Sequence, residues 1–240
     1  MLTMFVGYDP REAAAYHVFC QSVIAHASVP CAFVPMSEKM LHVDGQQDGS
    51  NAFIYSRYLV PHLMGYAGWA VFADGDMVCQ RDIAELWALR DPQYAVQVVK
   101  HEYQTKDRLK YRGSPMESPN MSYPRKNWSS LVLWNCGHPA NRALTPETVA
   151  TAGGQYLHRF AWLPDDQIGE LPREWNWLVG EYPPQPAALL HYTLGVPGFK
   201  YYAQWEQAQP WHDALIDTLH IYGENGINVL ARAYGRSDLA

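Results

Sequence analysis

The 240-residue chain predicts an α/β domain with a mostly parallel central sheet. Short apolar runs of strand-forming residues alternate along it with segments whose apolar residues recur at helical spacing. No internal repeat or low-complexity linker divides the sequence. A chain of this length can bury a large core, so we expect one domain over 1–240.

The composition is that of a globular protein. Hydrophobic residues make up 48% and charged residues 18%, which argues against disorder, and the net charge of −6 argues against a general nucleic-acid binder. No apolar run approaches the roughly 18 residues of a membrane span, and Asp9 interrupts the first apolar run too early for a signal peptide. The four scattered cysteines predict reduced thiols and a cytoplasmic location.

The first half of the chain is expected to alternate strands and helices. Asp9, Pro10 and Glu12 have the pattern of an N-cap, a first-turn proline and a capping-box acid, which predicts that a helix begins there. Ser50 is a candidate cap for the second helix, and a bend is expected near Pro61. The expected elements are a strand over Leu2–Val6, a helix from Asp9 to His26, a strand over Cys31–Val34, a polar connection over 35–49, a helix from Ser50 to Leu63 and a strand over Trp69–Ala73.

The second half contains one long segment without periodicity. Residues 101–127 are polar and hold three prolines, and seven of the 18 Lys/Arg lie between Lys100 and Lys126. This segment is either a plain solvated loop or a lid that closes over a diphosphate or an anionic acceptor. The other expected elements are strands over Tyr94–Val99, Trp128–Asn135 and Leu189–Thr193, a helix over Thr145–Phe160 interrupted at Gly153-Gly154, and a helical tail over 203–240 with helices over Trp211–Tyr222 and Ile227–Tyr234.

The most informative motif is Asp74-Gly75-Asp76, which directly follows the apolar run Trp69–Ala73. In open α/β sheets the carboxyl ends of strands are the ligand-binding edge. Two crowded carboxylates repel each other, and Mg²⁺ or Mn²⁺ relieves this repulsion and binds phosphate oxygens in turn. Glycine allows a close backbone approach. The simpler alternative is a polar turn after a strand.

A strand followed by Asp-x-Asp also fits the haloacid-dehalogenase-like phosphohydrolases. There Asp74 would be a nucleophile and Asp76 a general acid, and Asp165-Asp166 would be the later acidic pair that holds magnesium. In that family, however, the nucleophile usually follows the first strand. Here a strand–helix–strand–helix unit precedes Asp74, which disfavours this alternative.

Five motifs in a fixed order resemble glycosyltransferase family 8, which includes glycogenin and bacterial lipopolysaccharide galactosyltransferases. An arginine-containing helix that ends in a proline motif leads there into a strand bearing a DxD metal site. The similar segments over residues 2–202 are Ser56-Arg57-Tyr58-Leu59-Val60-Pro61-His62-Leu63, Trp69 to Asp76, Trp128 to Asn135, Asp166-Gln167, and His191-Tyr192 before Gly195. The resemblance implies a GT-A fold, a Rossmann-like sheet that binds a nucleotide-sugar.

The resemblance also implies the roles of individual residues. Asp74, Asp76 and His191 would hold Mn²⁺ or Mg²⁺, with an imidazole beside the two carboxylates. Asp166 and Gln167 would face the transferred sugar as the catalytic pair. The implied nucleotide or donor contacts are Tyr8, Asp9, Arg57, Asp74, Gly75 and Lys200.

Three departures from the family pattern limit this transfer. Gly195 falls four residues after His191 instead of three, and Lys200 follows nine residues after it, farther than the family's lysine. Trp128 stands where the family favours asparagine. The sugar contact there would then come from Asn127, Ser129 or Ser130.

The resemblance implies a metal-dependent hexosyltransferase that retains the anomeric configuration, with UDP-glucose or UDP-galactose as donor. A front-face substitution is favoured, because neither Asp166 nor Gln167 is a convincing nucleophile. The acceptor is a glycan, a lipid-linked sugar, a protein or a small molecule, and no nucleic-acid partner or stable membrane anchor is expected. The alternative from another class is a non-catalytic nucleotide-sugar-binding protein.

Overall fold

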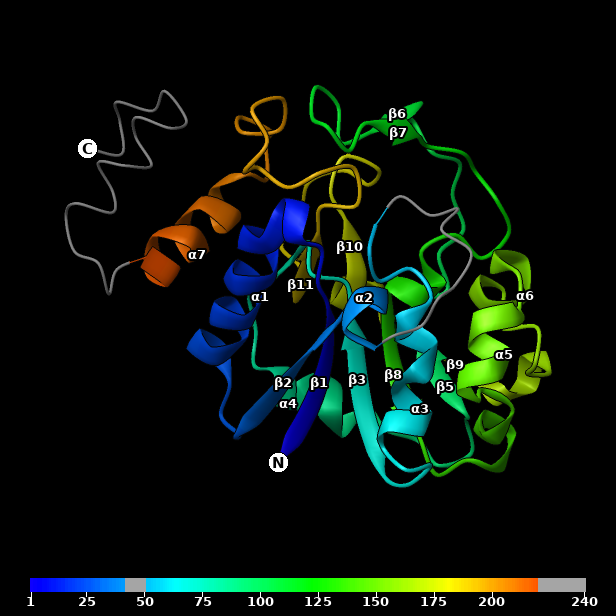
Figure 1. Ribbon diagram of the computed structural model, residues 1–240. Coiled ribbons are helices and arrows are strands. Elements are labelled where there is room, and N and C mark those ends of the chain that lie inside the picture. The colour runs from blue at the N-terminus through cyan, green and yellow to red at the C-terminus, as the bar shows by residue number, and fades with distance from the viewer. Residues whose placement is uncertain (42–50, 220–240) are drawn as a thin grey trace.

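Helices cover both faces of a six-stranded central sheet in the computed structural model, which describes residues 1–41 and 51–219 (Figure 1). The strand order is β2-β1-β3-β8-β5-β9, and every neighbouring pair is parallel except the two that β8 makes. The prediction of a mostly parallel sheet is therefore confirmed. The strands are β1 (Leu2–Gly7), β2 (Cys31–Met36), β3 (Trp69–Ala73), β5 (Val96–Val98), β8 (Leu131–Asn135) and β9 (Ile168–Glu170).

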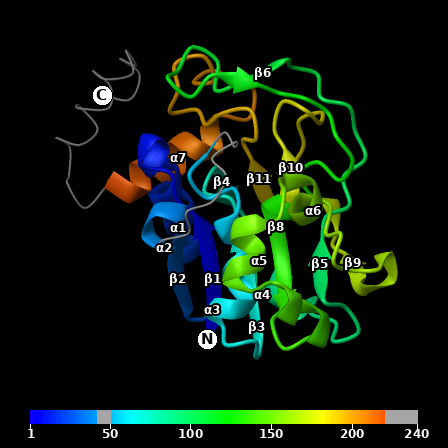
Figure 2. The same cartoon turned by 45° about the vertical axis from the view of Figure 1, so that its right-hand side comes forward.

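Alternate side chains along the central strands point to opposite faces of the sheet and pack into two separate hydrophobic cores. Phe72 and Trp134 pack on one face with the 3-10 turn η2 (Ser56–Leu59) and helices α3 (Val60–Leu63), α5 (Pro146–Thr151) and α6 (Gly154–His158). Val71 and Leu133 pack on the other face with α1 (Ala13–His26) and α4 (Ile83–Ala88). Figure 2 shows the helices on the two sides of the sheet. Burial on both faces explains why these strands are continuous apolar runs.

A second, three-stranded sheet lies above the carboxyl end of β3. Its order is β10-β11-β4, where β4 is Met77–Cys79, β10 is Trp177–Leu178 and β11 is Leu189–His191. Helix α7 (Gln209–Leu219) packs against α1 and contributes Trp211 and Leu215 to a third core. Through the pairing of β11 with β4, this second sheet brings the segment Leu189–His191 close to the end of β3.

The segment 101–127 has structure of its own. Strands β6 (Leu109–Lys110) and β7 (Ser118–Pro119) pair within it, and Asn120 Nδ2 donates to the Asp107 carbonyl oxygen at 2.8 Å. Lys126 Nζ donates to Asn120 Oδ1, and Thr105 Oγ1 donates to a carboxylate oxygen of Glu181. The segment is thus tied to itself and to the turn after β10, and it is not a plain solvated loop.

Several expected elements are shorter than predicted. The helix expected up to Leu63 consists of η2 followed by α3, and the helix over Thr145–Phe160 is broken into α5 and α6 at the predicted glycines. Ser50 and the helix over Ile227–Tyr234 lie outside the described residues. The remaining elements are α2 (Glu38–Leu41) and the 3-10 turns η1 (Pro10–Glu12), η3 (Trp128–Ser130), η4 (Pro139–Ala143), η5 (Asp165–Gln167) and η6 (Arg173–Asn176).

Two observations bear on the expectations drawn from composition. All four cysteines are free thiols, two of them buried and two partly buried. Within the described ranges 1–41 and 51–219, no helix has both the length and the apolar character needed to cross a membrane.

The core on the α5–α6 face predicts a large loss of stability in Trp134→Ala. Trp134 is fully buried and stacks on Trp162 with 6.4 Å between ring centroids. Its truncation should lower the free energy of unfolding by about 3–5 kcal/mol, measured by urea denaturation. The exposed Ile24 of α1 is the control, and Ile24→Ala should change that energy by less than about 0.5 kcal/mol. Equal losses in both variants would contradict this description of the core.

Candidate functional site

The turn between β3 and β4 is built around a close approach of two backbones. Asp74 N donates to the Ser130 carbonyl oxygen at 2.8 Å, which fixes the end of β3 beside the start of β8. A Cβ atom on Gly75 would lie 2.3 Å from the carbonyl oxygen of Gly7 at the end of β1. Only glycine therefore allows the Asp-Gly-Asp turn to pack against β1.

The pairing of β11 with β4 brings His191 to this turn. The two strands are antiparallel, with His191 opposite Met77, the residue after Asp76. The backbone nitrogen of Tyr192 donates to the Asp76 carbonyl oxygen at 2.9 Å and continues the ladder by one residue. This register places the His191 side chain beside both aspartates.

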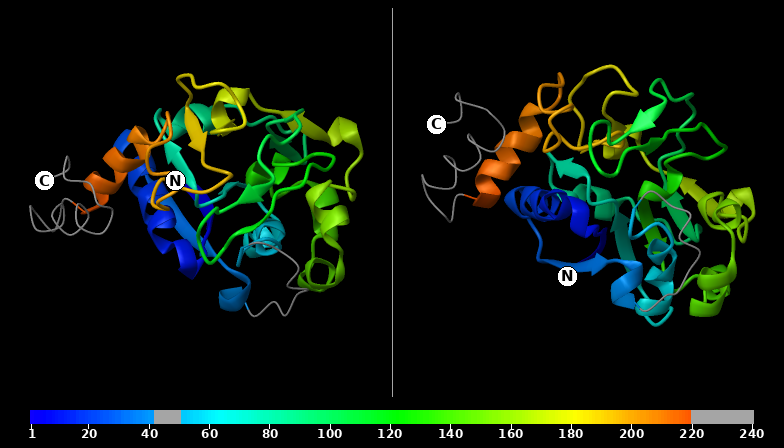
Figure 3. Two further views of the ribbon diagram at one scale, coloured as in Figure 1. Left: turned by 90° about the horizontal axis from the view of Figure 1, so that it is seen from above. Right: turned by 45° about the horizontal axis from the view of Figure 1, so that its top comes forward.

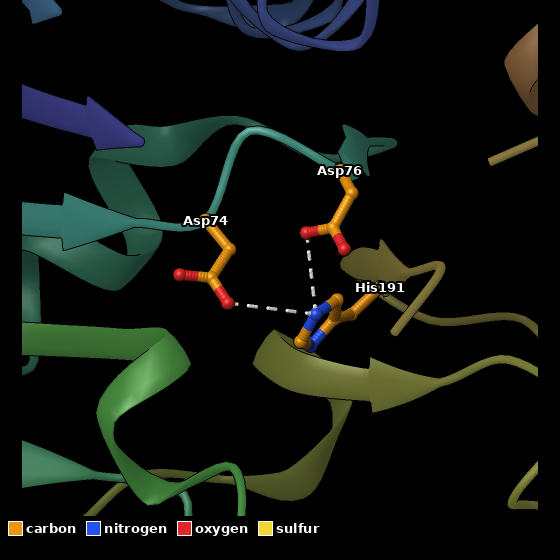
Figure 4. A group of neighbouring side chains, drawn as sticks. All are labelled: Asp74, Asp76 and His191. Carbon is orange, nitrogen blue, oxygen red and sulfur yellow. Dashed lines mark ion pairs between the residues drawn. The ribbon is translucent and has the colours of Figure 1, made fainter. Parts of the chain in front are cut away.

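Asp74, Asp76 and His191 form a buried cluster with the chemistry of a metal site. Figure 4 shows the three side chains pointing toward one another, and their potential ligand atoms lie within 4.8 Å of each other. His191 Nε2 is 3.3 Å from Asp76 Oδ1 and 3.8 Å from Asp74 Oδ2. Asp76 Oδ1 is buried and accepts no hydrogen bond from the described residues, whereas Asp74 Oδ1 is ion-paired with Arg57. Two carboxylates and one imidazole suit Mn²⁺ or Mg²⁺.

Asn176 fixes the orientation and the tautomer of His191. Its Oδ1 lies 2.9 Å from His191 Nδ1, and its Nδ2 donates to Ser130 Oγ at 2.8 Å and to the Asn127 carbonyl oxygen at 3.4 Å. The Asn127 carbonyl oxygen can only accept a hydrogen bond, so the amide nitrogen of Asn176 must face it and the amide oxygen must face His191. Since that oxygen also only accepts, His191 Nδ1 carries the proton. With the proton on Nδ1, Nε2 is the ring atom that faces the two aspartates and that could coordinate a metal ion.

Arg57 neutralises part of the charge of the cluster. Its Nη1 lies 2.8 Å from Asp74 Oδ1 and donates to the Ser129 carbonyl oxygen at 2.9 Å, while its Nε donates to the Ile54 carbonyl oxygen. The guanidinium also lies 4.9 Å from the centre of the Phe72 ring. The side chain is buried, so Arg57 does not lie on a solvated face of the chain.

The crowding of acids perturbs their protonation. Burial raises the pKa of Asp74 to about 6, an effect that Arg57 opposes and the charge of Asp76 reinforces. Burial acts in the same direction on Asp76, but His191 and Lys110 hold its pKa below the usual value. The pKa of Glu12 lies well above its usual value because of burial and of the charge of Asp76. Such a cluster gains from a cation that balances its charge.

A cavity of about 440 Å³ opens beside Asp74. Arg57 and Ser129 line it, and Lys110 lines it from the segment 101–127. Its remaining wall comes from η2, from α6 and from residues near 121–130. The residues that line it are Asn51, Ile54, Tyr55, Arg57, Asp74, Lys110, Met121, Tyr123, Asn127, Ser129, Ser130, Gly154, Gln155, His158 and Arg159. A larger surface hollow lies between Gln80 and Pro210, away from the aspartates.

Tyr8 and Asp9 lie at the same sheet edge as Asp74, because both follow β1. Tyr8 is half-buried and packs edge-on against Tyr16. Asp9 is buried and caps η1, as its sequence pattern predicts: Oδ1 accepts from the backbone nitrogen of Arg11 at 2.9 Å, and Oδ2 accepts from that of Ala52 at 3.0 Å. Its carboxylate therefore holds the loop after β1.

The placement of Asp166 and Gln167 corrects the prediction that they face the donor sugar. Both lie in η5, directly before β9, and the Gln167 carbonyl oxygen accepts from Ala95 N at the start of β5. Since β5 and β9 run parallel to β3, these residues lie at the amino edge of the sheet and Asp74 at the carboxyl edge. Asp166 is exposed there and lines no part of the cavity.

Lys200 is also not brought to the cluster. It is exposed in the turn after Phe199 and does not line the cavity, where Lys110 is found instead. The predicted alternatives Asn127, Ser129 and Ser130 do line it.

The sequence did not predict that Asn176 contacts His191, nor that Lys110 lines the cavity. Asn176 carried one usable signal, a polar residue between two tryptophans in an apolar run. Lys110 was seen only as one of several charges in a basic segment, and no local pattern separates it from its neighbours.

Comparisons with known proteins identify the family of this chain. The sequence model of the family "Glycosyl transferase family 8" matches residues 12–134, which include Arg57, Asp74 and Asp76. The protein CDI of Arabidopsis thaliana is 44% identical over 221 residues, which is 87% of this chain and 83% of that protein.

Solved structures establish the fold. The apo bifunctional glycosyltransferase WbbM aligns with a TM-score of 0.58 at 16% identity and covers 92% of this chain, although the chain spans only 51% of that protein. The galactosyltransferase LgtC, in complex with donor and acceptor sugar analogues, aligns with a TM-score of 0.55 at 12% identity, over 89% of this chain and 95% of LgtC. The predicted GT-A fold is confirmed.

The contact between Gly75 and Gly7 predicts that Gly75→Ala strains the turn that carries both aspartates. The atom in the way is a backbone oxygen, so relief requires β1 and the turn to separate. We expect a loss of about 1–3 kcal/mol in the free energy of unfolding, typical of overpacking. Gly153→Ala is the matched control, because a Cβ atom there meets no atom within 4 Å. If the two variants unfold at the same denaturant concentration, the close approach is not a constraint.

Proposed function

The chain belongs to glycosyltransferase family 8, and from this premise we propose that it transfers a hexose from a nucleoside-diphosphate sugar with retention of configuration. The proposed cofactor is Mn²⁺ or Mg²⁺, held by Asp74, Asp76 and His191. The proposed donor is UDP-glucose or UDP-galactose, an expectation that rests on the resemblance stated above.

The observation that carries this proposal is the buried Asp–Asp–His cluster, whose Asp74 lines a cavity. Asn176 holds Nδ1 of the histidine, and Asp76 Oδ1 is buried and accepts no hydrogen bond from the described residues. The cluster is therefore an incomplete set of interactions. A divalent cation completes that set, and a sugar-sized molecule fits in a cavity of about 440 Å³ beside it. The arrangement supports metal-assisted chemistry on a phosphorylated sugar.

The bound metal would supply electrostatic stabilisation of the departing diphosphate. The chain's own residues would then position the donor. The guanidinium of Arg57 holds Asp74 in place through an ion pair. Ser129 and Ser130 line the cavity and would provide hydroxyl groups for hydrogen bonds to the donor. Tyr8, at the carboxyl end of β1, is the proposed contact for the base or ribose.

A front-face substitution is the mechanism that this site supports. The only acid in the described lining of the cavity is Asp74, which is already paired with Arg57. Asp166 lies at the other edge of the sheet and would not reach an anomeric carbon at the metal site. The acceptor hydroxyl would therefore attack on the same face from which the diphosphate leaves, and a leaving phosphate oxygen would take its proton.

The acceptor class stays open between a glycan, a lipid-linked sugar, a protein and a small molecule, and the cytoplasmic location stays a prediction. Family membership disfavours the phosphohydrolase alternative, in which Asp74 would be a nucleophile. A non-catalytic nucleotide-sugar-binding protein would have the same fold, so turnover must be measured.

Metal-dependent hydrolysis of UDP-sugars tests the proposed function. The protein should release UDP from UDP-glucose or UDP-galactose with Mn²⁺, and chelation by EDTA should abolish the release. Asp76→Asn removes one charged ligand and should lower the rate by at least about 100-fold, since a metal contributes several kcal/mol of charge stabilisation. Asp213→Asn, an exposed residue of α7, is the matched control and should leave the rate unchanged.

The outcomes separate the three functions. NMR should detect the sugar released early in the reaction as the α-anomer if configuration is retained. Tight binding of UDP and Mn²⁺ without turnover of any UDP-sugar, even with acceptor sugars present, would indicate a binding protein. Hydrolysis of p-nitrophenyl phosphate that is lost in Asp74→Asn would overturn the transferase assignment of this site.

The contact between Asn176 and His191 predicts a loss of metal affinity in Asn176→Leu. Leucine removes the acceptor that keeps the proton on Nδ1, so His191 is free to rotate or to change tautomer. The affinity for Mn²⁺, measured by calorimetry, should fall by about 10- to 100-fold. Asn176→Asp keeps an oxygen acceptor and should retain most of the affinity. An unchanged affinity in Asn176→Leu would show that His191 is not a ligand.

A further inference from the structure

Lys110 is a cation that the segment 101–127 places at the metal cluster. It ends β6, lines the same cavity as Asp74 and Arg57, and is partly buried. Burial lowers its pKa below the usual value, and the negative charges of Asp76 and Asp74 oppose that shift. The ammonium group thus lies within the electrostatic reach of both proposed metal ligands.

The backbone around Lys110 is fixed from two sides. Lys110 is paired with Ser118 in the β6–β7 ladder, and the next residue, Tyr111, donates from its backbone nitrogen to the Leu194 carbonyl oxygen at 2.6 Å. The backbone nitrogen of Arg112 then donates to the hydroxyl oxygen of Tyr202 at 2.8 Å. Figure 3 shows the segment 101–127 and the chain that follows β11 side by side above the sheet. Lys110 is therefore held at the cavity by the same segment that carries His191.

The ammonium group of Lys110 has unused hydrogen-bonding capacity. Its one hydrogen bond to a described residue is a long one, 3.4 Å, from Nζ to Thr193 Oγ1, which also accepts from Asn127 Nδ2 at 3.1 Å. No carboxylate of the described residues lies within 4.0 Å of Nζ. An ammonium has three protons to donate, so a ligand with oxygen acceptors can complete its hydrogen bonds.

Arg57, Lys110 and Arg159 are the cations that line the cavity, and Arg57 and Lys110 are those whose charges lower the pKa of Asp74. Arg57 is paired with Asp74 and with two backbone carbonyl oxygens. Lys126 donates to Asn120 and to the Met121 carbonyl oxygen, and Lys200 is exposed outside the cavity. Lys110 is the lysine that lines the cavity.

We propose that Lys110 binds the diphosphate of the donor sugar and stabilises it as the leaving group, whereas the family resemblance had implied Lys200 as the lysine that contacts the donor. This inference rests on the proposed transferase function. As the bond between the anomeric carbon and the diphosphate oxygen breaks, the electron pair stays on that oxygen, and the acceptor oxygen forms the new bond to the carbon. The acceptor proton passes to the leaving phosphate, and Lys110 stays protonated throughout. Its charge therefore counts most when the negative charge on the diphosphate is greatest.

The test compares phosphate-dependent binding in matched lysine variants. Lys110→Met keeps the length of the side chain and removes its charge, and should weaken the binding of UDP with Mn²⁺ by about 10- to 100-fold, the loss of a hydrogen bond to a charged group. Binding of uridine, which has no phosphate, should not change. Lys110→Arg keeps a cation and should retain most of the UDP affinity. Lys106→Met, on the exposed side of the same segment, should bind UDP as the wild type does.

The results distinguish this inference from the function on which it rests. If the wild type does not bind UDP, GDP or ADP with Mn²⁺, the proposed function fails and the role of Lys110 fails with it. If the wild type binds UDP and Lys110→Met binds it equally well, only the role of Lys110 is overturned. A loss of uridine and UDP binding together, also in Lys110→Arg, would show that Lys110 supports the fold of the segment instead of binding phosphate.

Discussion

The antiparallel pairing of β11 with β4 is the constraint on which the site depends. Its register places His191 opposite Met77 and ties Tyr192 to the Asp76 carbonyl oxygen. A shift by one residue would turn the imidazole to the other face of the small sheet and separate it from both carboxylates. The site therefore forms only when distant parts of the chain come together, since β4 directly follows β3 in the sequence and β11 lies more than 100 residues later.

The site combines rigid packing with unfavourable electrostatics. Gly75 against Gly7 and Asn176 against His191 leave little freedom at the turn and at the imidazole. Two buried carboxylates held in this way repel each other, and Arg57 offsets only part of that repulsion. Proteins keep such arrangements where a ligand supplies the missing charge. A divalent cation therefore fits the site for two reasons: the folded chain leaves negative charge on the two carboxylates unbalanced, and carboxylate and imidazole groups are suitable metal ligands.

The sequence predicted those parts of the site that local patterns encode. The run Trp69–Ala73 followed by Asp-Gly-Asp specified a buried strand and a polar turn, and the order of motifs led to His191. It did not predict β4, because a three-residue strand has no periodicity and exists only through its pairing with β11. Asp166 was misplaced because the edge of the sheet at which it lies depends on the direction of β9, which pairing with β5 determines.

Charge balance explains why cations come from two distant segments. Arg57, next to β3, and Lys110, from the segment 101–127, offset part of the negative charge of Asp74 and Asp76. In the proposed complex a divalent cation would offset the rest together with the charge of the sugar diphosphate. As the bond to the sugar breaks, negative charge builds up on the departing nucleotide until the acceptor proton reaches it. A lysine with unused hydrogen-bonding capacity can respond to that change, whereas Arg57, already paired, cannot. The segment that seemed unstructured in the sequence thus completes the electrostatics of the site.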